Sequence, residues 1–358
     1  MSREFSYQGS AAHIAFGEGK SQTAPEWLER LGCSRALVLS TPHQKEQAEI
    51  LAAGLGPLSV GIFSGAVMHT PVNVTESAMK AVRECGADCL VALGGGSTTG
   101  LGKAIAYRTD LPQIVIPTTY AGSEVTSILG QTEGGRKTTI RDAKILPEVV
   151  IYDPALTTGL PIELSVTSGL NAMAHALEGL YAQDRNPISS LMAIEGLRAF
   201  GSALPELVSE PGNLAARTDA MYAAWLCGTV LGTVGMALHH KICHTLGGTF
   251  DTPHAETHAI MLPHTAAFNA VAVPHLLEPV AKIFGGEVGG GLWDFAKSIG
   301  APTSLMDLGL TEGDLDVASR TAVESPYWNP RPIDQQSIRE MLQQAWEGKR
   351  PSHQQSKA

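Results

Sequence analysis

Asp88-Cys89-Leu90-Val91-Ala92-Leu93-Gly94-Gly95-Gly96-Ser97-Thr98-Thr99 is an apolar run that leads into three glycines and then into hydroxyl side chains. The apolar part predicts a buried strand, and the residues after the glycines predict the start of a helix. Glycine allows the backbone to turn tightly and to approach a ligand closely. The first N–H groups of a helix have no partner within it, so they suit a diphosphate group. Three glycines also fit an ordinary strand-to-helix turn, so this loop needs independent support.

A second loop provides that support. The segment Pro117-Thr118-Thr119-Tyr120-Ala121-Gly122-Ser123-Glu124-Val125-Thr126 follows the next apolar run, Ile114-Val115-Ile116. Hydroxyl groups at the carboxyl end of a parallel strand can hydrogen-bond ribose and phosphate oxygens. Together the two loops predict a nicotinamide dinucleotide site. The residues predicted to bind this cofactor are Gly94, Gly95, Gly96, Ser97, Thr118, Thr119, Ser123 and Thr126.

The two halves of the chain differ in composition and in the spacing of their apolar residues. In the first half, apolar runs at 36–39, 89–93, 114–116 and 149–152 alternate with helical patterns at 75–85 and 101–107. This alternation predicts a parallel sheet covered by helices on both faces. The second half is rich in Ala, Leu, Met and His, with helical spacing over 165–182, 214–233 and 236–246. We therefore predict an α/β dinucleotide-binding domain over residues 1–158 and an all-α domain over residues 159–358.

Charge and composition exclude several classes of partner. The formal net charge is -10, and no run of Lys or Arg occurs. This argues against nucleic acid or an anionic membrane surface as a partner, although a small anionic substrate remains compatible. No uninterrupted apolar stretch is long enough to span a membrane. The five cysteines are an odd number, and the first residues lack the apolar core of a secretory signal. We therefore expect reduced thiols and a cytoplasmic location.

The histidines of the second half are spaced as a functional cluster would be. Asn171 and His175 are four residues apart, as are His240 and His244, so each pair shares a helix face. Side chains at this spacing can converge on one metal ion or one substrate. Three more histidines follow within the next stretch: His254, His258 and His264. For His175, His240 and His254 a functional role is favoured, whereas His258 and His264 are interpreted as ordinary core or surface histidines.

At this point the chain resembles the iron-containing alcohol dehydrogenases, and within that family the maleylacetate reductases. The resemblance spans most of the chain. It rests on Phe16-Gly17-Glu18-Gly19, the two loops from Gly94 to Lys103 and from Pro117 to Thr126, Lys137 before Pro147, the stretches Gly169 to Glu178 and Gly235 to Pro263, and Trp328-Asn329-Pro330-Arg331-Pro332. It implies a homodimer with the fold of the dehydroquinate synthases. It also implies that Thr41, Lys137 and Leu160 bind the cofactor.

Three positions depart from the wider family. The family's metal ligands, one Asp and three His, correspond here to Asn171, His175, His240 and His254. Asn171 replaces the only charged ligand, and neutral groups alone hold a divalent cation less well. We therefore expect no bound metal. Gly100 stands where the loop usually has an Asp. Thr41 stands where many members carry an Asp that binds the adenosine 2′-hydroxyl, so we expect both NADH and NADPH to be accepted.

The resemblance implies reduction of maleylacetate to 3-oxoadipate, a step in the aerobic catabolism of aromatic rings. Maleylacetate is a small dianion whose carbon–carbon double bond is conjugated to a ketone. Hydride addition places charge on the ketone oxygen, where hydrogen-bond donors can stabilise it. Imidazoles beside two substrate carboxylates should have raised pKa values. The residues expected to stabilise the enolate, supply a proton and hold the carboxylates are His175, His240, His244, His254 and Lys241.

Three other functions remain open. A metal-dependent dehydrogenase of a small alcohol or aldehyde would keep the same class of chemistry, and a tightly bound iron or zinc would favour it. A lyase of the dehydroquinate synthase type would use NAD transiently, but its metal site also needs a carboxylate, which counts against it here. A non-catalytic cofactor-binding protein is the third. Turnover of NADH with maleylacetate separates all of these.

Overall fold

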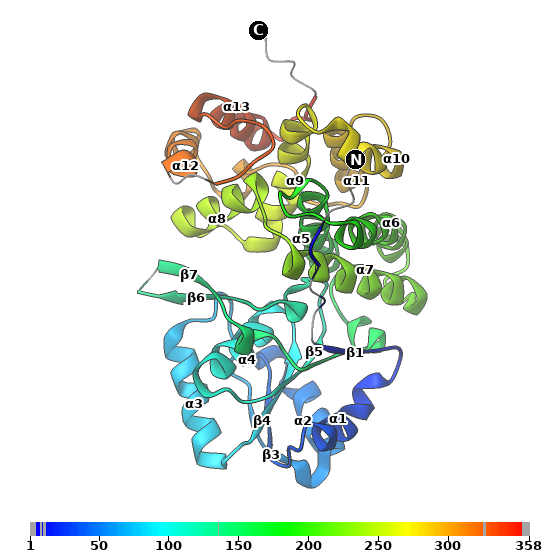
Figure 1. Cartoon of the computed structure of the whole chain (residues 1–358), viewed down its shortest axis with the longest axis vertical. Coiled ribbons are helices and arrows are strands. Elements are labelled where there is room, and N and C mark those ends of the chain that lie inside the picture. Colours follow the sequence, from blue (N-terminus) through cyan, green and yellow to red (C-terminus); the bar gives the residue numbers. More distant parts are fainter. Residues whose placement is uncertain (1–4, 8, 10–11, 135, 325–326, 353–358) are drawn as a thin grey trace. The chain divides into compact units, whose positions relative to one another are not determined.

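The computed structural model of the chain describes residues 5–7, 9, 12–134, 136–324 and 327–352 (Figure 1). They form two compact units. One unit covers residues 9–160, and the other covers residues 161–358 together with the described residues that precede Gly9. Among the described residues no single helix is long and apolar enough to cross a membrane. One pair of helices, Leu214–Thr233 with Leu238–Phe250, passes that length and composition test only together and is bent by 94°.

The first unit is built on a six-stranded parallel sheet with the order β1-β8-β5-β4-β2-β3. The strands are β1 (His13–Phe16), β2 (Ala36–Leu39), β3 (Ser59–Phe63), β4 (Cys89–Gly94), β5 (Gln113–Pro117) and β8 (Val149–Tyr152). The predicted α/β class with a parallel sheet is confirmed. An antiparallel hairpin of β6 (Ile128–Glu133) and β7 (Arg136–Arg141) accompanies the sheet and was not predicted.

Helices cover both faces of this sheet, and alternate strand residues point to each. Helices α1 (Ala24–Arg30) and α2 (Lys45–Leu55) pack on one face against Val38, Val91 and Ile114. On the other face, α3 (Val72–Cys85) and α4 (Gly96–Thr109) pack against Leu37, Leu90 and Val115. Because both faces are buried, the central strands are continuous apolar runs rather than alternating ones.

The order of the strands fixes where a ligand can bind. From β2 the chain moves outward to β3, whereas from β4 it moves outward in the opposite direction to β5. The neighbours β2 and β4 therefore flank the point at which the connections reverse direction. In open parallel sheets, ligands bind outside the carboxyl ends of the strands at this switch point. Thr41 follows β2, and Gly94 ends β4.

The second unit is helical, as predicted. Its helices are α5 (Ile162–Tyr181), α6 (Pro187–Ser209), α7 (Leu214–Thr233), α8 (Leu238–Phe250), α9 (His254–Ala270), α10 (Pro274–Phe284), α11 (Val288–Ser298), α12 (Glu312–Glu324) and α13 (Gln335–Trp346). Helix α5 packs against α6, α7 and α9 and is buried along nearly its whole length. A helix buried on all sides carries few charges, so the polar residues that α5 keeps inside require partners.

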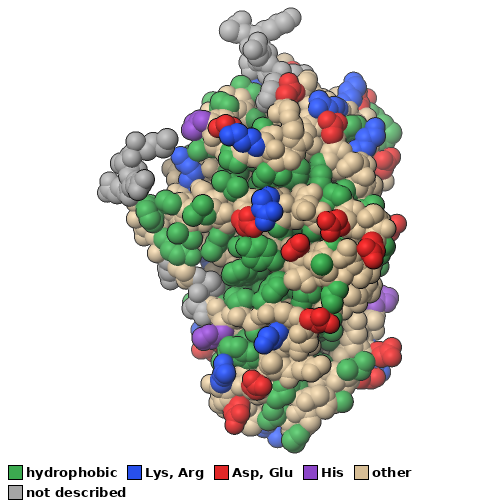
Figure 2. All heavy atoms as spheres, turned by 90° about the vertical axis from the view of Figure 1, so that its right-hand side faces the viewer, with side chains coloured by type: hydrophobic (Ala, Val, Ile, Leu, Met, Phe, Trp, Pro, Cys, Tyr) green, Lys and Arg blue, Asp and Glu red, His purple; other side chains and the backbone are tan. Residues whose placement is uncertain are grey.

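Acidic and basic side chains are mixed on the face of the molecule that Figure 2 shows. Figure 2 shows one face of the molecule, where red and blue side chains are interspersed and neither sign forms a continuous patch. This distribution accompanies the formal net charge of -10.

Candidate functional site: a nucleotide loop and a histidine cluster

The glycine loop lies at the switch point of the sheet and needs its first two glycines for packing. Gly94 has a φ of +150°, and a Cβ there would lie 2.4 Å from Oγ1 of Thr98. A Cβ on Gly95 would lie 2.7 Å from the methyl carbon of Thr119. Gly96 is exposed and faces open space, so a ligand can approach the backbone there. No side chain caps α4, and its first turn carries no acidic residue. Its N-terminal N–H groups therefore suit an anion.

A glutamine connects the predicted cofactor residues at this edge. Nε2 of Gln44 donates to Oγ1 of Thr118 at 2.8 Å, and Thr41 Oγ1 donates to Oε1 of Gln44 at 3.1 Å. The N–H of Thr118 donates to the carbonyl of Gly94 at 3.1 Å. The structure thus brings Thr41, Gly94 and Thr118 together. Gln44 was missed in the sequence because the residue it contacts lies 74 positions away.

The second loop is fixed to α4 by a buried lysine. Nζ of Lys103 donates to the carbonyls of Ser123, Thr126 and Ile128, at 2.6, 2.7 and 3.0 Å, and to Thr126 Oγ1 at 2.9 Å. Burial lowers the pKa of Lys103 to about 7. The Thr126 hydroxyl in turn donates to the Ser123 carbonyl, so its hydrogen-bonding capacity is used within the loop. Ser123 itself is half-buried.

Two predicted cofactor residues lie away from these loops in the sequence. Lys137 is in β7, paired with Thr132, and its side chain lies outside the described residues. Leu160 is the last residue of the first unit, and its N–H donates to the carbonyl of Thr157 at 3.0 Å. A third predicted cofactor residue, Ser97, lies within the glycine loop and is half-buried in the first turn of α4.

The predicted histidines of the second unit form one cluster on α5, α8 and α9. The ring centroids of His175 and His240 are 5.0 Å apart, and those of His240 and His244 are 6.0 Å apart. His254 is the first residue of α9. Its ring lies 4.4 Å from that of His258, which lies 5.1 Å from that of His240. His258 is therefore a member of the cluster, contrary to its interpretation as an ordinary core histidine.

A buried carboxylate supports this cluster. Glu178 lies on α5 and is fully buried, and its Oε2 lies 2.6 Å from Nδ1 of His240. It also accepts the N–H groups of Ala237 at 3.0 Å and His239 at 2.8 Å, at the start of α8, where no side chain of that helix provides a cap. Burial alone would raise the pKa of Glu178, but the His240 bond and these N–H groups lower it to about 2. Glu178 is therefore an anion at neutral pH.

Two buried imidazoles of the cluster, His175 and His258, are neutral at neutral pH. Burial, followed by the neighbouring histidines, lowers the pKa of His175 and His258 well below the ordinary histidine value. In the protein alone, desolvation opposes the charged form of these two imidazoles; the rise in pKa expected beside two substrate carboxylates stays a prediction for the substrate complex. Lys241 is only partly buried, and its ammonium lies 5.7 Å from the centre of the Tyr327 ring. His244 is exposed.

Several buried polar atoms of the cluster have no hydrogen-bond partner among the described residues. Within the described part of the chain, Asn171 Oδ1, His175 Nδ1, His240 Nε2 and His258 Nε2 are buried and have no hydrogen-bond partner. Buried polar atoms are nearly always satisfied, so such a group indicates a ligand. One amide oxygen and three imidazole nitrogens are donors that a transition metal accepts. The donor set fits a metal ion.

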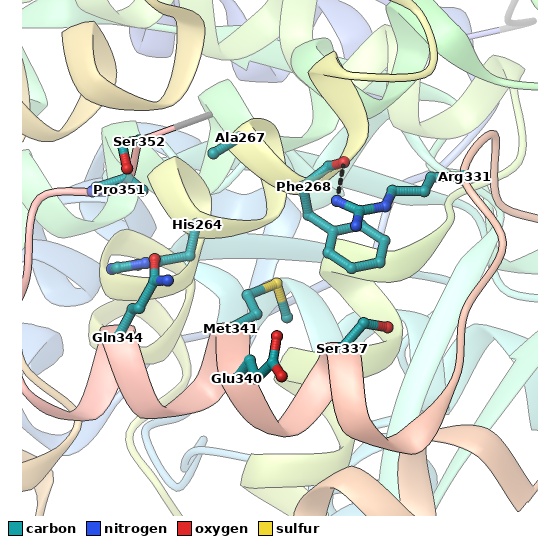
Figure 3. A pocket seen from close by; sticks show the side chains of 10 residues that line it. All are labelled: His264, Ala267, Phe268, Arg331, Ser337, Glu340, Met341, Gln344, Pro351 and Ser352. Carbon is teal, nitrogen blue, oxygen red and sulfur yellow. Dashed lines mark hydrogen bonds between the residues drawn. The ribbon is translucent and has the colours of Figure 1, made fainter. Parts of the chain in front are cut away.

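His264 lies outside the histidine cluster. It lines a cavity of about 50 Å³ between residues of α9 and α13, which Figure 3 shows from close by. Arg331 lies there, 4.1 Å from the centre of the Phe268 ring, and donates to the Phe268 carbonyl at 3.2 Å. Asn329, two residues earlier, exchanges hydrogen bonds with Asn269 at 2.8 and 3.0 Å. The Trp328–Pro332 segment is thus packed against the end of α9.

Comparison with known proteins places this architecture. Residues 11–154 match the family described as iron-containing alcohol dehydrogenase, and residues 165–346 match the C-terminal part of the Fe-containing alcohol dehydrogenase family. Maleylacetate reductase of Rhizobium sp. (strain MTP-10005) is 63% identical over 97% of this chain and 99% of its own length. Maleylacetate reductase of Burkholderia cepacia is 50% identical over the same shares. The crystal structure of maleylacetate reductase from Agrobacterium tumefaciens superimposes with a TM-score of 0.95, at 62% identity over 98% of this chain and all of that one.

These matches correct one expectation. Both halves match a family of iron-containing enzymes, which implies iron or another metal, so the expectation of a metal-free protein is wrong. The expectation considered only the neutral side chain of Asn171 and overlooked the Glu178 anion behind His240. A carboxylate that accepts the second N–H of a metal-binding imidazole makes that imidazole a better ligand. The chain belongs to the iron-containing alcohol dehydrogenase family, and within it to the maleylacetate reductases, which are nicotinamide-dependent oxidoreductases.

Proposed function

We propose that the protein reduces the carbon–carbon double bond of maleylacetate with hydride from NADH or NADPH and releases 3-oxoadipate, as a step in aromatic-ring catabolism. Hydride adds to the alkene carbon farther from the ketone, the electron pair moves to the ketone oxygen as an enolate, and a proton is then delivered to the nearer carbon. The observation that carries this proposal is 63% identity, over nearly the full length, to a protein named for that substrate.

The nucleotide is assigned to the first unit. The N-terminus of α4, beginning at Gly96, would hold the diphosphate, because its N–H groups are uncapped and Gly96 is open to solvent. Thr41, Thr118 and Thr119 would contact the ribose and phosphate oxygens. Gln44 orients the first two of these hydroxyls. No carboxylate stands at position 41 to repel a 2′-phosphate.

A metal is assigned to the histidine cluster. Asn171, His175, His240 and His254 would hold it, since three of these four present buried polar atoms that lack a hydrogen-bond partner among the described residues. When bound, a divalent metal supplies Lewis acidity toward the ketone oxygen of the substrate. Nδ1 of His240 donates to Oε2 of Glu178, so Nε2 is the ring nitrogen left for a metal.

The remaining polar groups are assigned to the substrate. Lys241 is partly buried beside Tyr327 and would hold one carboxylate of the dianion. His244 is exposed one helical turn after His240, so it can exchange protons with water and supply the proton that goes to carbon. The dianion therefore meets positive charge and a proton donor on one face of α8.

The proposal also covers the oligomeric state and the cellular location. We expect a homodimer in solution, and β1 supports it as a short edge strand that pairs only with β8 among the described strands. We expect a cytoplasmic location, which the five free cysteines support. Light scattering during gel filtration measures the first property, and fractionation of the source cells measures the second.

Deuterium transfer tests the reaction itself. NADH labelled with deuterium at the transferred position is incubated with maleylacetate, and the product is examined by mass spectrometry and NMR. The proposal predicts 3-oxoadipate with one deuterium on the carbon farther from the ketone, where it survives exchange in basic water. Deuterium on a carbinol carbon, with the double bond intact, would identify a ketone reductase and refute the proposal.

A further inference from the structure

Tyr327 has a buried hydroxyl that none of the described residues engages. Its ring is partly buried against the core of the second unit, and its hydroxyl oxygen has no hydrogen-bond partner among the described residues. Buried polar atoms nearly always have a partner, so a hydroxyl in this state indicates a ligand. Nδ1 of His175 and Nε2 of His240, in the histidine cluster, are buried in the same unpartnered state.

A hydrogen-bond network ties the segment that carries Tyr327 to this cluster. Asn329, two residues later, exchanges hydrogen bonds with the fully buried Asn269, at 2.8 and 3.0 Å. The amide nitrogen of Asn269 also donates to the hydroxyl of Tyr181 at 3.1 Å, and that hydroxyl donates to Oε1 of Glu178 at 3.4 Å. Glu178 is the carboxylate that supports the histidine cluster. The place of the segment is therefore fixed by the same group that orders the site.

The charge beside Tyr327 determines which kind of ligand fits there. The ammonium of Lys241 lies 5.7 Å from the centre of the Tyr327 ring. Burial, followed by the negative charge of Glu178, raises the pKa of Tyr327, so its hydroxyl keeps its hydrogen and can donate it. Two donors, one of them cationic, require an anionic acceptor. A carboxylate suits both, because each of its two oxygens can accept one of them.

We propose that Tyr327 is a specificity residue of the site, and that its hydroxyl donates to the same substrate carboxylate that pairs with Lys241. This rests on the proposed function, in which Lys241 holds one carboxylate of maleylacetate. The lysine supplies charge, and the tyrosine supplies a donor of fixed direction. Small aldehydes and ketones have no acceptor for it, so they leave a buried hydroxyl unpaired, which lowers their affinity. The contact is independent of what occupies the histidine cluster.

Steady-state kinetics of Tyr327→Phe test the proposal in the full-length protein. Phenylalanine keeps the ring, its packing and its contact with Lys241, and removes only the hydroxyl. We expect KM for maleylacetate to rise by at least about tenfold and kcat to change by less than about twofold, since a hydrogen bond to a charged group is lost from the ground state and the transition state alike. Partial loss of folded protein would lower kcat without raising KM, so this division identifies a binding contact.

Two further measurements accompany this variant. The NADH dissociation constant of Tyr327→Phe should equal that of the parent, because the glycine loop belongs to the other unit. Tyr222→Phe changes a partly buried tyrosine on α7 that contacts Trp225, and it should keep the parental KM.

A double-mutant cycle shows whether the two side chains bind one carboxylate. Lys241→Met removes the ammonium and keeps an unbranched chain. If Tyr327 and Lys241 share a carboxylate, KM in the double variant should rise by clearly less than the product of the two single effects. A double effect equal to that product would place the two side chains on separate groups of the substrate and overturn the proposal.

The remaining outcomes also count against the proposal. A parental KM in Tyr327→Phe, with maleylacetate turned over by the parent, overturns this inference and leaves the proposed function intact. A fall in kcat at unchanged KM would assign the hydroxyl to the transition state alone and remove it from substrate binding. If the parent does not turn over maleylacetate, the proposed function fails, and the role of Tyr327 fails with it.

Discussion

Nδ1 of His240 lies 2.6 Å from Oε2 of Glu178, a carboxylate that is fully buried and also accepts backbone N–H groups at the start of α8. This one side chain caps a helix, fixes the tautomer of a site histidine and supplies a negative charge to the cluster. Asn171 brings no negative charge to the proposed metal site. Glu178 supplies one from behind His240, without being a ligand itself.

Replacing Glu178 with Gln should weaken metal binding and turnover together. An amide presents N–H groups where the native carboxylate accepts them, so it can no longer satisfy all of these donors. We expect a metal dissociation constant about 10- to 100-fold higher, the usual effect of losing a carboxylate behind a ligand. Dialysis against Co²⁺ measures it. Glu195→Gln, a half-buried surface glutamate paired with Arg198, is the control. Equal dissociation constants for Glu178→Gln and the parent would disprove the link.

Thr41 should determine how evenly the two nicotinamide cofactors are used. The parent protein is expected to accept NADH and NADPH with modest discrimination, because Thr41 neither binds a 2′-hydroxyl through a carboxylate nor repels a 2′-phosphate. Thr41→Asp should shift the ratio of kcat/KM values toward NADH. A parent preference above about a thousandfold, roughly 4 kcal/mol, would show that another residue makes the selection.

Lys103 should make stability depend on pH. Burial lowers its pKa to about 7, against about 10.4 in an unfolded chain. Between these values the unfolded chain holds a proton that the folded chain lacks, so the free energy of unfolding should rise with pH, by up to about 1.4 kcal/mol per unit. Lys103→Met should lose this rise, whereas Lys80→Met, an exposed control, should keep it.

Urea unfolding across the window from about pH 7 to about pH 9 measures this difference. Parallel curves for Lys103→Met and the parent would mean that Lys103 keeps its proton in the folded state. The four oxygens around Nζ would then stabilise the ammonium more than burial opposes it.

His244 should act on turnover rather than on cofactor binding. Without its proton donor, His244→Ala should lower kcat with maleylacetate by roughly a hundredfold. The dissociation constant of NADH, measured by fluorescence, should hardly change, because the glycine loop belongs to the other unit. His275→Ala, an exposed histidine on α10, is the matched control. Near-parental kcat in His244→Ala would remove it from the proton path.

Sequence patterns predicted the parts of the fold that local composition determines. The central strands are apolar runs because both faces of the sheet are buried, so β2 and β8 begin and end where predicted. The edge strands β1 and β3 are only partly buried, and Gly61 interrupts the apolar residues of β3. The hairpin β6–β7 is largely polar, and its first strand includes Gln131 and Thr132. The hairpin therefore has no long apolar run from which a strand could be predicted.

Spacing along single helices predicted pairs of site residues, and the family resemblance joined residues of different helices into one site. His240 and His244 follow from a four-residue interval, and so does the pair Asn171 and His175. The role of Glu178 was not predicted, because its partner His240 is 62 residues away and a contact between two helices has no sequence signature. The place of His258 in the cluster depends on its contact with His239, 19 residues away, which only a three-dimensional structure reveals.

The rate of NADH oxidation with maleylacetate, compared with the rate with small aldehydes and ketones, tests the central claim most directly. Absorbance of NADH gives kcat/KM for each substrate with the purified full-length protein. The account predicts that maleylacetate is preferred by at least about a thousandfold, since Lys241 would hold a carboxylate that small aldehydes and ketones lack. A simple aldehyde reduced as efficiently as maleylacetate would contradict the account and identify an alcohol dehydrogenase.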